Sequence, residues 1–200
     1  MEQRTIYTVG HSNHPIERFI DLLRQHRIEA VADVRSSPFS RHNPQFTKAA
    51  LQGSLRDAAI KYVFLGRELG ARPSDPACYD RGAVSYDKLA ATDAFNEGLS
   101  RVERGAADYR LALMCAERDP LDCHRTILVS RHLVERGARV LHILADGTVE
   151  AHEAAIGRLL DRLKMPTTDL FRTRDDLVRE AYETQGSNIA YVERDPVEAP

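Results

Sequence analysis

Short apolar runs alternate with amphipathic segments along most of this chain, and this alternation restricts its fold more than any other feature. Runs typical of buried strands occupy residues 5–9, 30–34, 62–65, 109–115 and 139–144. Segments with the apolar spacing of helices occupy residues 15–26, 47–59, 86–104, 126–136 and 150–164. Strands separated by helices predict right-handed βαβ connections. We therefore expect an α/β fold with five mainly parallel strands and helices on both faces of the sheet.

Pro166 ends the alternation. Residues 1–165 are predicted to form one α/β domain, and residues 166–191 a helical C-terminal extension packed on it. The helix of that extension is predicted at residues 170–182. The acidic and proline-containing residues 192–200 are predicted to form a flexible tail.

Composition and charge exclude several classes of function. The 200 residues carry a formal net charge of −2, so the chain as a whole has no electrostatic attraction for DNA or an anionic membrane. No stretch is apolar enough for a signal peptide or a membrane span. Three cysteines without an export signal predict free thiols in a reducing compartment. We expect a cytoplasmic protein with no membrane partner and no cofactor.

Polar residues follow three of the predicted strands at the point where each strand ends. Residues 11–13 (HSN) follow the first strand, residues 33–35 (DVR) end the second, and residues 115–117 (CAE) end the fourth. The carboxyl ends of parallel strands meet at one edge of a sheet, where α/β proteins bind their ligands. We expect these three loops to form one site.

The segment LALMCAERDPLDCHR contains two of the three cysteines. Cys115 ends the fourth strand, and Cys123 follows eight residues later at the start of a helix, where unpaired amides stabilise anions and thiolates. Either thiol is a candidate nucleophile, activated by His124, Arg118 or Arg125. The alternatives are two buried thiols that act as small hydrophobic side chains, or a redox pair.

Zinc binding is a further interpretation of these cysteines, with His11 and His124 as additional ligands. Structural zinc sites show closely paired ligands such as Cys-x-x-Cys, and the spacing here is wider. We therefore predict no metal.

Several other polar residues have both a structural and a functional interpretation. His11 is a candidate general base or part of a turn. Asp33 and Arg35 lie two residues apart, so their side chains point to the same side of the second strand. They form either an internal ion pair, or a site in which Arg35 binds an anion and Asp33 orients His11 or Arg125. His142 alternates with core residues and is predicted to be a buried structural histidine.

The loop after the second strand (SSPFSRHNPQF) interleaves basic and aromatic residues. Arg41 lies between Phe39 and Phe46, a pattern that suits phosphate contact and base stacking. The alternative is that the aromatic rings anchor the loop to the core. With Arg67 and Arg72 in the next loop, this edge of the sheet is expected to be locally cationic.

Five blocks of the sequence are similar to the uncharacterised bacterial DUF488 family. They span roughly residues 5–191 and read YTVGHSNHPIERFIDLL, VADVRSSPFSRHNPQF, YVFLGRELGARP, LMCAERDPLDCHR and AYETQGSNIAY. The resemblance implies a shared fold and shared polar loops, and it implies no established reaction.

Part of the chain also resembles rhodanese and the related cysteine phosphatases. VADVR is similar to the end of an early rhodanese strand, and the order from LALMC through RTILVSRHLVERGARV is similar to the surroundings of the rhodanese nucleophile. This resemblance implies a Rossmann-like or rhodanese-like sheet with Cys115 as the nucleophile. Leu121 stands where the phosphatase pattern has an arginine, so the loop departs from that pattern.

These observations predict a cysteine-dependent enzyme for a small anionic or phosphate-bearing ligand, using sulfur-transfer, phosphatase-like or redox chemistry. One alternative is a nucleotide- or nucleic-acid-binding module that uses arginines without covalent chemistry. Another is a domain that acts through protein contacts. The candidate catalytic residues are Cys115, Cys123, His11 and Asp33. The candidate anion-binding residues are Ser12, Asn13, Arg35, Arg41, Glu117, His124 and Arg125.

Overall fold

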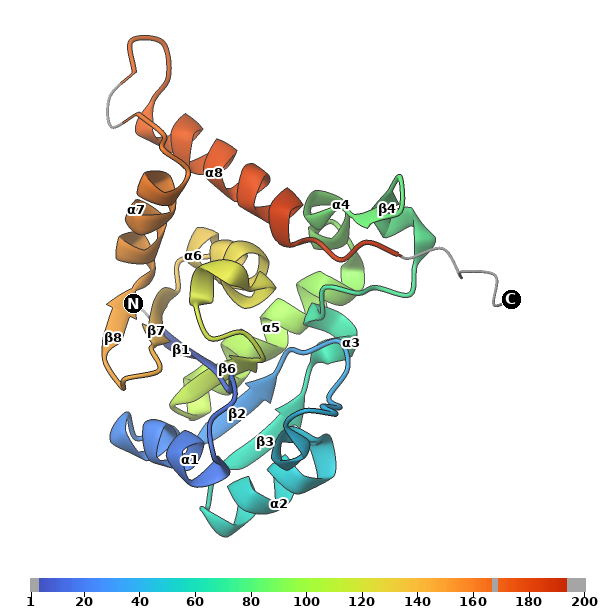
Figure 1. Cartoon of the computed structure of the whole chain (residues 1–200), viewed down its shortest axis with the longest axis vertical. Coiled ribbons are helices and arrows are strands. Elements are labelled where there is room, and N and C mark those ends of the chain that lie inside the picture. Colours follow the sequence, from blue (N-terminus) through green and yellow to red (C-terminus); the bar gives the residue numbers. More distant parts are fainter. Residues whose placement is uncertain (1–3, 167–168, 194–200) are drawn as a thin grey trace.

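Six strands form one mixed sheet (Figure 1). The structure is a computed structural model and describes residues 4–166 and 169–193. The parallel strands are β1 (Thr5–Gly10), β2 (Ala30–Asp33), β3 (Lys61–Phe64), β6 (Leu111–Cys115) and β7 (Arg139–Ile143). Their order across the sheet is β3-β2-β6-β1-β7, and β8 (Val149–Ala151) pairs antiparallel with β7 at the edge.

The sixth strand corrects the prediction of five strands. The apolar spacing predicts a helix from residue 150, whereas the helix begins at His152 after the short β8. A turn before β8 reverses the chain: Asp146 accepts hydrogen bonds from the amide and hydroxyl of Thr148 (2.9 and 2.7 Å), and Gly147 has a φ of 96°. A three-residue strand is too short to show the alternation by which strands are recognised.

Helices cover both faces of the sheet. On one face lie α1 (Ile16–Gln25) and α2 (Lys48–Asp57). On the other lie α3 (Gly66–Leu69), α4 (Tyr86–Ala90), α5 (Asp93–Asp108) and α6 (Arg131–Glu135). The smaller elements are the hairpin of β4 (Tyr79–Asp80) and β5 (Ala83–Val84) and three 3-10 turns at Pro44–Phe46, Pro76–Cys78 and Pro120–Asp122.

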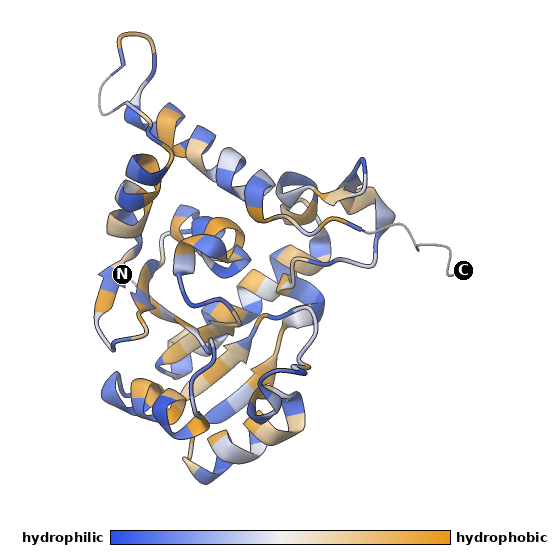
Figure 2. Cartoon of the chain, viewed as in Figure 1, coloured by the Kyte–Doolittle hydropathy of each residue, from blue (hydrophilic) through white to orange (hydrophobic). Residues whose placement is uncertain are grey.

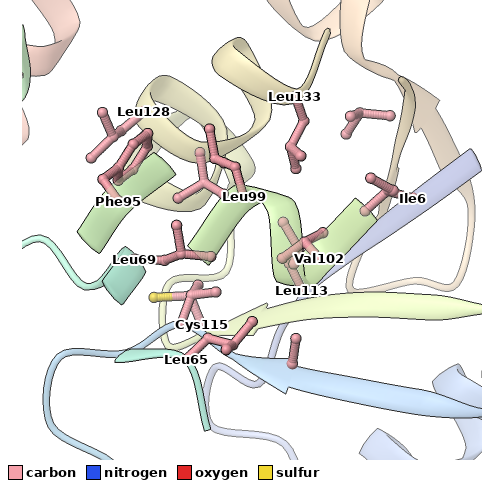
Figure 3. Close-up of a cluster of buried hydrophobic side chains, with 14 of the residues drawn as sticks. Ile6, Leu65, Leu69, Phe95, Leu99, Val102, Leu113, Cys115, Leu128 and Leu133 are labelled. Atoms are coloured by element: carbon pink, nitrogen blue, oxygen red, sulfur yellow. The ribbon is translucent and has the colours of Figure 1, made fainter. Parts of the chain in front are cut away.

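Alternate residues of each strand enter two separate cores. In β1, Ile6 faces the α5 side and Tyr7 faces the α1 side. Figure 2 shows hydrophobic residues concentrated in the sheet and blue, hydrophilic positions spread over the outer helices. Figure 3 shows the α5-side core, in which Cys115 packs in the same cluster as Leu65 and Leu69. The carboxyl end of β6 is therefore anchored in this core.

Two of the predicted helices are divided. The segment predicted as one helix at 86–104 forms α4 and α5, because the Thr92 hydroxyl caps a new helix by accepting from the Phe95 amide (3.2 Å). The segment predicted at 126–136 begins as a π-helical turn (Arg125–Ser130) that continues into α6. Such turns are frequent at functional sites.

The predicted C-terminal extension contains α8 (Arg174–Ile189), which packs against α7 (His152–Arg162), the last helix of the predicted α/β domain. Figure 1 shows α8 running from the end of α7 towards α4 and the β4 hairpin. The helix is predicted at residues 170–182, but it begins at Arg174 and ends at Ile189. It begins later than predicted because a capping box between Thr173 and Asp176 fixes its first turn. None of the helices in the described ranges is long and apolar enough to cross a membrane.

The first residues of the predicted tail are ordered by backbone bonds. Val192 pairs with Ala83 of β5, and the Glu193 amide donates to the Gly82 carbonyl (2.8 Å). The rest of that predicted tail, residues 194–200, lies outside the described residues.

A chain of buried polar side chains joins the sheet to the C-terminal extension. Thr8 Oγ1 is hydrogen-bonded to His142 Nδ1 (2.8 Å), and His142 Nε2 to His152 Nδ1 (3.0 Å). His152 Nε2 is hydrogen-bonded in turn to the Tyr182 hydroxyl (2.7 Å). Burial lowers the pKa of His152 to about 4 and lowers that of His142 well below its usual range. His142 is thus buried and structural, as its place in the strand predicts.

The buried histidines should make the fold sensitive to acid. An unfolded histidine takes up a proton below a pH of about 6.5, whereas folded His152 stays neutral down to about pH 4. The unfolded state therefore binds more protons in this window. The free energy of unfolding should fall as the pH drops from about 6.5 to 4, by up to about 1.4 kcal/mol for each unit of difference in pKa.

Urea unfolding at several pH values measures this dependence. His152→Gln should flatten it, while His42→Gln, which replaces an exposed histidine, should leave it unchanged. If His152→Gln keeps the full slope, the acid sensitivity comes from other groups.

Candidate functional site

A cleft of about 1290 Å³ opens at the carboxyl edge of the sheet. Residues from the loops after β1, β2 and β6 line it, so the three polar loops expected to meet do share one cleft. The segment after α8 contributes a further side. The lining includes His11, Ser12, Asn13, Arg35, Phe39, Arg72, Tyr86, Cys115, Glu117, His124 and Tyr191.

Asp33 and Arg35 form a buried ion pair at the end of β2. Arg35 Nε and Nη2 donate to the two carboxylate oxygens of Asp33 (2.9 and 2.7 Å). The Tyr62 hydroxyl donates to the same carboxylate (2.9 Å). Burial lowers the pKa of Arg35, but Asp33 outweighs burial and raises it overall. Arg35 therefore keeps its charge and a fixed orientation, and its remaining N–H groups are available to an anion in the cleft.

His11 holds the other side of Arg35. Its Nδ1 donates to the Ser12 carbonyl (2.8 Å), which leaves Nε2 to accept from Arg35 Nη1 (3.2 Å). Phe46 stacks on the imidazole with ring centroids 4.2 Å apart. Burial lowers the pKa of His11 to about 4, in keeping with a neutral ring. Both nitrogens of the expected general base are thus bonded, and His11 positions Arg35.

Cys115, Cys123 and His124 come together at the floor of this site. His124 Nδ1 lies 3.7 Å from Cys115 Sγ and 3.9 Å from Cys123 Sγ. All three atoms lie within 4.8 Å of one another. His124 Nε2 donates to the Val34 carbonyl (3.0 Å), which directs Nδ1 at the sulfurs. Cys115 lines the cleft, whereas Cys123 lies behind the lining residues.

The surroundings of Cys123 favour its thiolate more than those of Cys115 do. Burial raises the pKa of the Cys123 thiol, but Cys115, Arg125 and His124 outweigh burial and lower it overall. The Arg125 amide also donates to Cys123 Sγ (3.4 Å). Burial and the neighbouring Cys123 raise the pKa of Cys115. Burial lowers the pKa of His124, but Cys123 outweighs burial and raises it.

Arg125 is fully buried and has no carboxylate partner among the described residues. Its Nη1 donates to the Glu117 carbonyl (2.9 Å), and its Nε has no hydrogen-bond partner within the described part of the chain. A buried charge is costly unless it is balanced. Glu117 Oε2 lies 2.9 Å from Cys123 Sγ, and burial together with Cys123 raises the pKa of Glu117. The 2.9 Å contact needs a proton between these two acidic groups, so the pair carries one negative charge to balance Arg125.

The loop after β6 is fixed by contacts with α7 and with itself. Asp119 accepts hydrogen bonds from Arg158 (2.8 and 3.1 Å) and from Arg162 (2.8 Å). The Leu121 amide donates to Asp119 Oδ1 (3.0 Å), and the Cys123 amide donates to a carbonyl of the 3-10 turn (3.3 Å). These two amides, which a phosphatase-type loop would direct at an anion, are already bonded.

The structure places two of the predicted anion-binding residues outside the cleft lining. Arg41 is exposed and Arg125 is fully buried, whereas Ser12, Asn13 and Glu117 line the cleft. The loop that carries Arg41 contributes Phe39 to the cleft instead, with 69% of its surface exposed.

Two tyrosines in the cleft were missed by reasoning from the sequence. Tyr86 begins α4, and burial and the two cysteines raise its pKa. Tyr191 follows α8, and the Arg72 guanidinium lies 4.5 Å from the centre of its ring. Tyr191 ends the block AYETQGSNIAY, which was a signal that the C-terminus takes part. No motif marks Tyr86.

Comparison with protein families gives a match to a domain of unknown function, DUF488, over residues 15–132. The matched region is more than half of the 200 residues, and it includes Arg35 and the Cys115–Cys123–His124 cluster. It leaves out β1, His11 and the C-terminal extension. No curated protein and no solved structure matches the chain.

Gly10, the last residue of β1, should tolerate no side chain. A Cβ there would lie 1.9 Å from the Glu117 carbonyl oxygen and 3.2 Å from Arg125 Nη2. Gly10→Ala is expected to lower the free energy of unfolding by about 1–3 kcal/mol, because it displaces the carbonyl that binds Arg125.

Gly53→Ala is the matched control, since Gly53 lies inside α2 with no atom within 4 Å of the added Cβ. It should raise stability by about 0.5–1 kcal/mol. Denaturant unfolding compares the two variants. Equal effects would mean that β1 and Glu117 do not approach each other this closely.

Proposed function

We propose that this chain, which belongs to the DUF488 family, is a cysteine-dependent enzyme for a small anionic substrate. The observation that carries the proposal is the position of Cys115, whose thiol meets Arg35 and His124 in one cleft. Arg35 supplies a fixed positive charge for the substrate. His124 supplies a nitrogen 3.7 Å from the thiol that can take its proton.

Sulfur transfer is the reaction that fits these groups best. The Cys115 thiolate attacks the outer sulfur of an anionic sulfane donor, and a new S–S bond forms on Cys115. The donor's own bond to that sulfur breaks, and the leaving anion keeps the electron pair beside Arg35. An acceptor thiolate then attacks the outer sulfur of the Cys115 persulfide and restores the Cys115 thiolate. The cycle needs no external oxidant or reductant.

The surrounding structure favours this chemistry over the phosphatase-like alternative. The loop amides of Leu121 and Cys123 are bonded within the loop, so they are not free to hold a phosphate. A nucleophilic cysteine at the end of a parallel strand supports the rhodanese-like part of the proposal. The free state of the three cysteines supports a cytoplasmic site of action.

Fewer of the predicted residues support nucleotide or nucleic-acid binding than support the cysteine-dependent enzyme. Of the arginines expected to act together, Arg35 and Arg72 line the cleft. The others, which lie outside the lining, are Arg41, Arg67 and Arg125. The exposed ring of Phe39 in the cleft is the feature that favours a base as part of the substrate.

The reactivity of Cys115 tests the proposal. Burial raises the pKa of both Cys115 and Cys78, but only Cys115 lines the cleft and lies 3.7 Å from a nitrogen that can take its proton. In reduced protein kept with EDTA at pH 7, iodoacetamide should therefore modify Cys115 at least about tenfold faster than Cys78. Incubation with thiosulfate should add one sulfur atom to Cys115 and release sulfite. Peptide mass spectrometry follows both reactions on each cysteine separately.

Arg35→Lys keeps a charge but loses the planar fork, and it should slow the reaction with thiosulfate by about tenfold or more. Arg41→Lys changes an exposed arginine outside the cleft and should leave the rate unchanged. If Cys115 reacts no faster than Cys78, the assignment of the nucleophile is wrong. If Cys115 is reactive but gains no sulfur, only sulfur transfer is excluded.

A further inference from the structure

The geometry of Cys115, Cys123 and His124 also matches the ligand set of a metal ion. In a tetrahedral zinc site the metal lies about 2.3 Å from a sulfur ligand and about 2.0 Å from a nitrogen ligand, so the sulfur and the nitrogen lie about 3.5 Å from each other. The corresponding Sγ to Nδ1 distances here are 3.7 and 3.9 Å. Small side-chain rotations would therefore bring all three atoms into bonding positions, since none lies more than 4.8 Å from another.

The groups around the cluster prepare its atoms for a cation. Metal-binding histidines usually donate their second ring N–H to a carbonyl or carboxylate. His124 does this through Nε2 to the Val34 carbonyl (3.0 Å), so the lone pair of a neutral ring lies on Nδ1 between the sulfurs. The Arg125 amide at 3.4 Å stabilises negative charge on Cys123 Sγ. Cys115 ends a central strand, so its position is fixed by the sheet.

The charges balance when a divalent cation is added. Two thiolates and the Glu117 carboxylate carry three negative charges, and a divalent cation with Arg125 carries three positive charges. The buried Arg125 guanidinium, which lacks a carboxylate partner among the described residues, then faces a complex of opposite charge. Arg125 thus stays balanced when the cation replaces the proton of the Cys115 thiol and the proton between Cys123 and Glu117.

We propose that Cys115, Cys123 and His124 bind a thiophilic divalent cation such as Zn²⁺. The fourth position faces the cleft, where Glu117 or water supplies an oxygen. The site goes beyond the proposed function, because it does not depend on Cys115 acting as a nucleophile. With the cation bound, Cys115 is a ligand and is no longer free to attack a substrate.

This proposed site differs from the prediction, made from the sequence, that no metal is bound. That prediction rested on the spacing between the cysteines, which is wider than the paired spacing of structural zinc sites. The spacing does not matter here, because the 3-10 turn Pro120–Asp122 folds the loop back and returns Cys123 to the end of β6.

Cobalt binding tests the site directly. Reduced full-length protein, freed of metal, is titrated with Co²⁺ under anaerobic conditions. One equivalent should produce the intense visible bands of tetrahedral Co²⁺ and a near-ultraviolet thiolate-to-Co²⁺ charge-transfer band, and Zn²⁺ should displace it. Cys123→Ser and His124→Ala should weaken binding by about 100-fold or more, because each removes a ligand. Cys78→Ser, the matched control, should keep wild-type binding.

Protection of the wild-type protein avoids any effect of the variants on folding. One equivalent of Zn²⁺ should slow alkylation of Cys115 and Cys123 by at least about tenfold and leave Cys78 unchanged. Absence of thiolate-to-Co²⁺ bands, or equal binding by Cys123→Ser, would overturn the proposal.

The outcomes separate this site from the proposed function. If Cys115 of the metal-free protein is alkylated no faster than Cys78 but the protein shows the Co²⁺ bands in the titration, Cys115 is not a nucleophile and the metal site stands. If Cys115 is alkylated rapidly and no Co²⁺ bands appear, the metal site is wrong and the nucleophile stands.

Discussion

The buried charge of Arg125 is the constraint on which the arrangement of the site depends. Its guanidinium lies against Gly10 and the Glu117 carbonyl, and its own amide bonds Cys123. Because the charge cannot reach water, negative charge has to be held nearby, and the sulfurs and the Glu117 side chain are the groups that supply it. The fold buries Arg125 and so requires this negative charge, whether the thiolates react with a substrate or bind a cation.

The position of the site could be predicted because the ends of parallel strands converge whatever the details of the loops. The pairing of Asp33 with Arg35 followed from the two-residue period of a strand. The closeness of Cys115 and Cys123 could not be predicted, since an irregular loop sets no distance between its ends. Contacts from α7 to Asp119 hold that loop, and no local pattern encodes them. The short β8 was missed for a similar reason, because its partner strand and turn define it.

The C-terminal extension belongs to the site more closely than its place in the sequence suggests. Gln185 of α8 donates to the Leu121 carbonyl in the loop between the two cysteines (2.8 Å). Tyr191 stacks under Arg72 and lines the cleft. The loop that carries the thiols is therefore held by α7 and α8 from outside, while the sheet holds it from inside. Changes far from the cleft in sequence should act on the thiols through this loop.

The central place of β1 has a consequence for how the protein is made. Residues 5–10 leave the ribosome long before their partners β6 and β7, with Gly10 paired to Cys115 and Thr5 to Arg139. Both edges of β1 stay unpaired until β6 and β7 have been synthesised about 100 residues or more later, whereas β2 and β3 can pair early through the local α2 connection. Such long-range pairing slows folding and leaves an apolar strand exposed to aggregation or to chaperones. The strand that leads into His11 is thus made well before either of its neighbours.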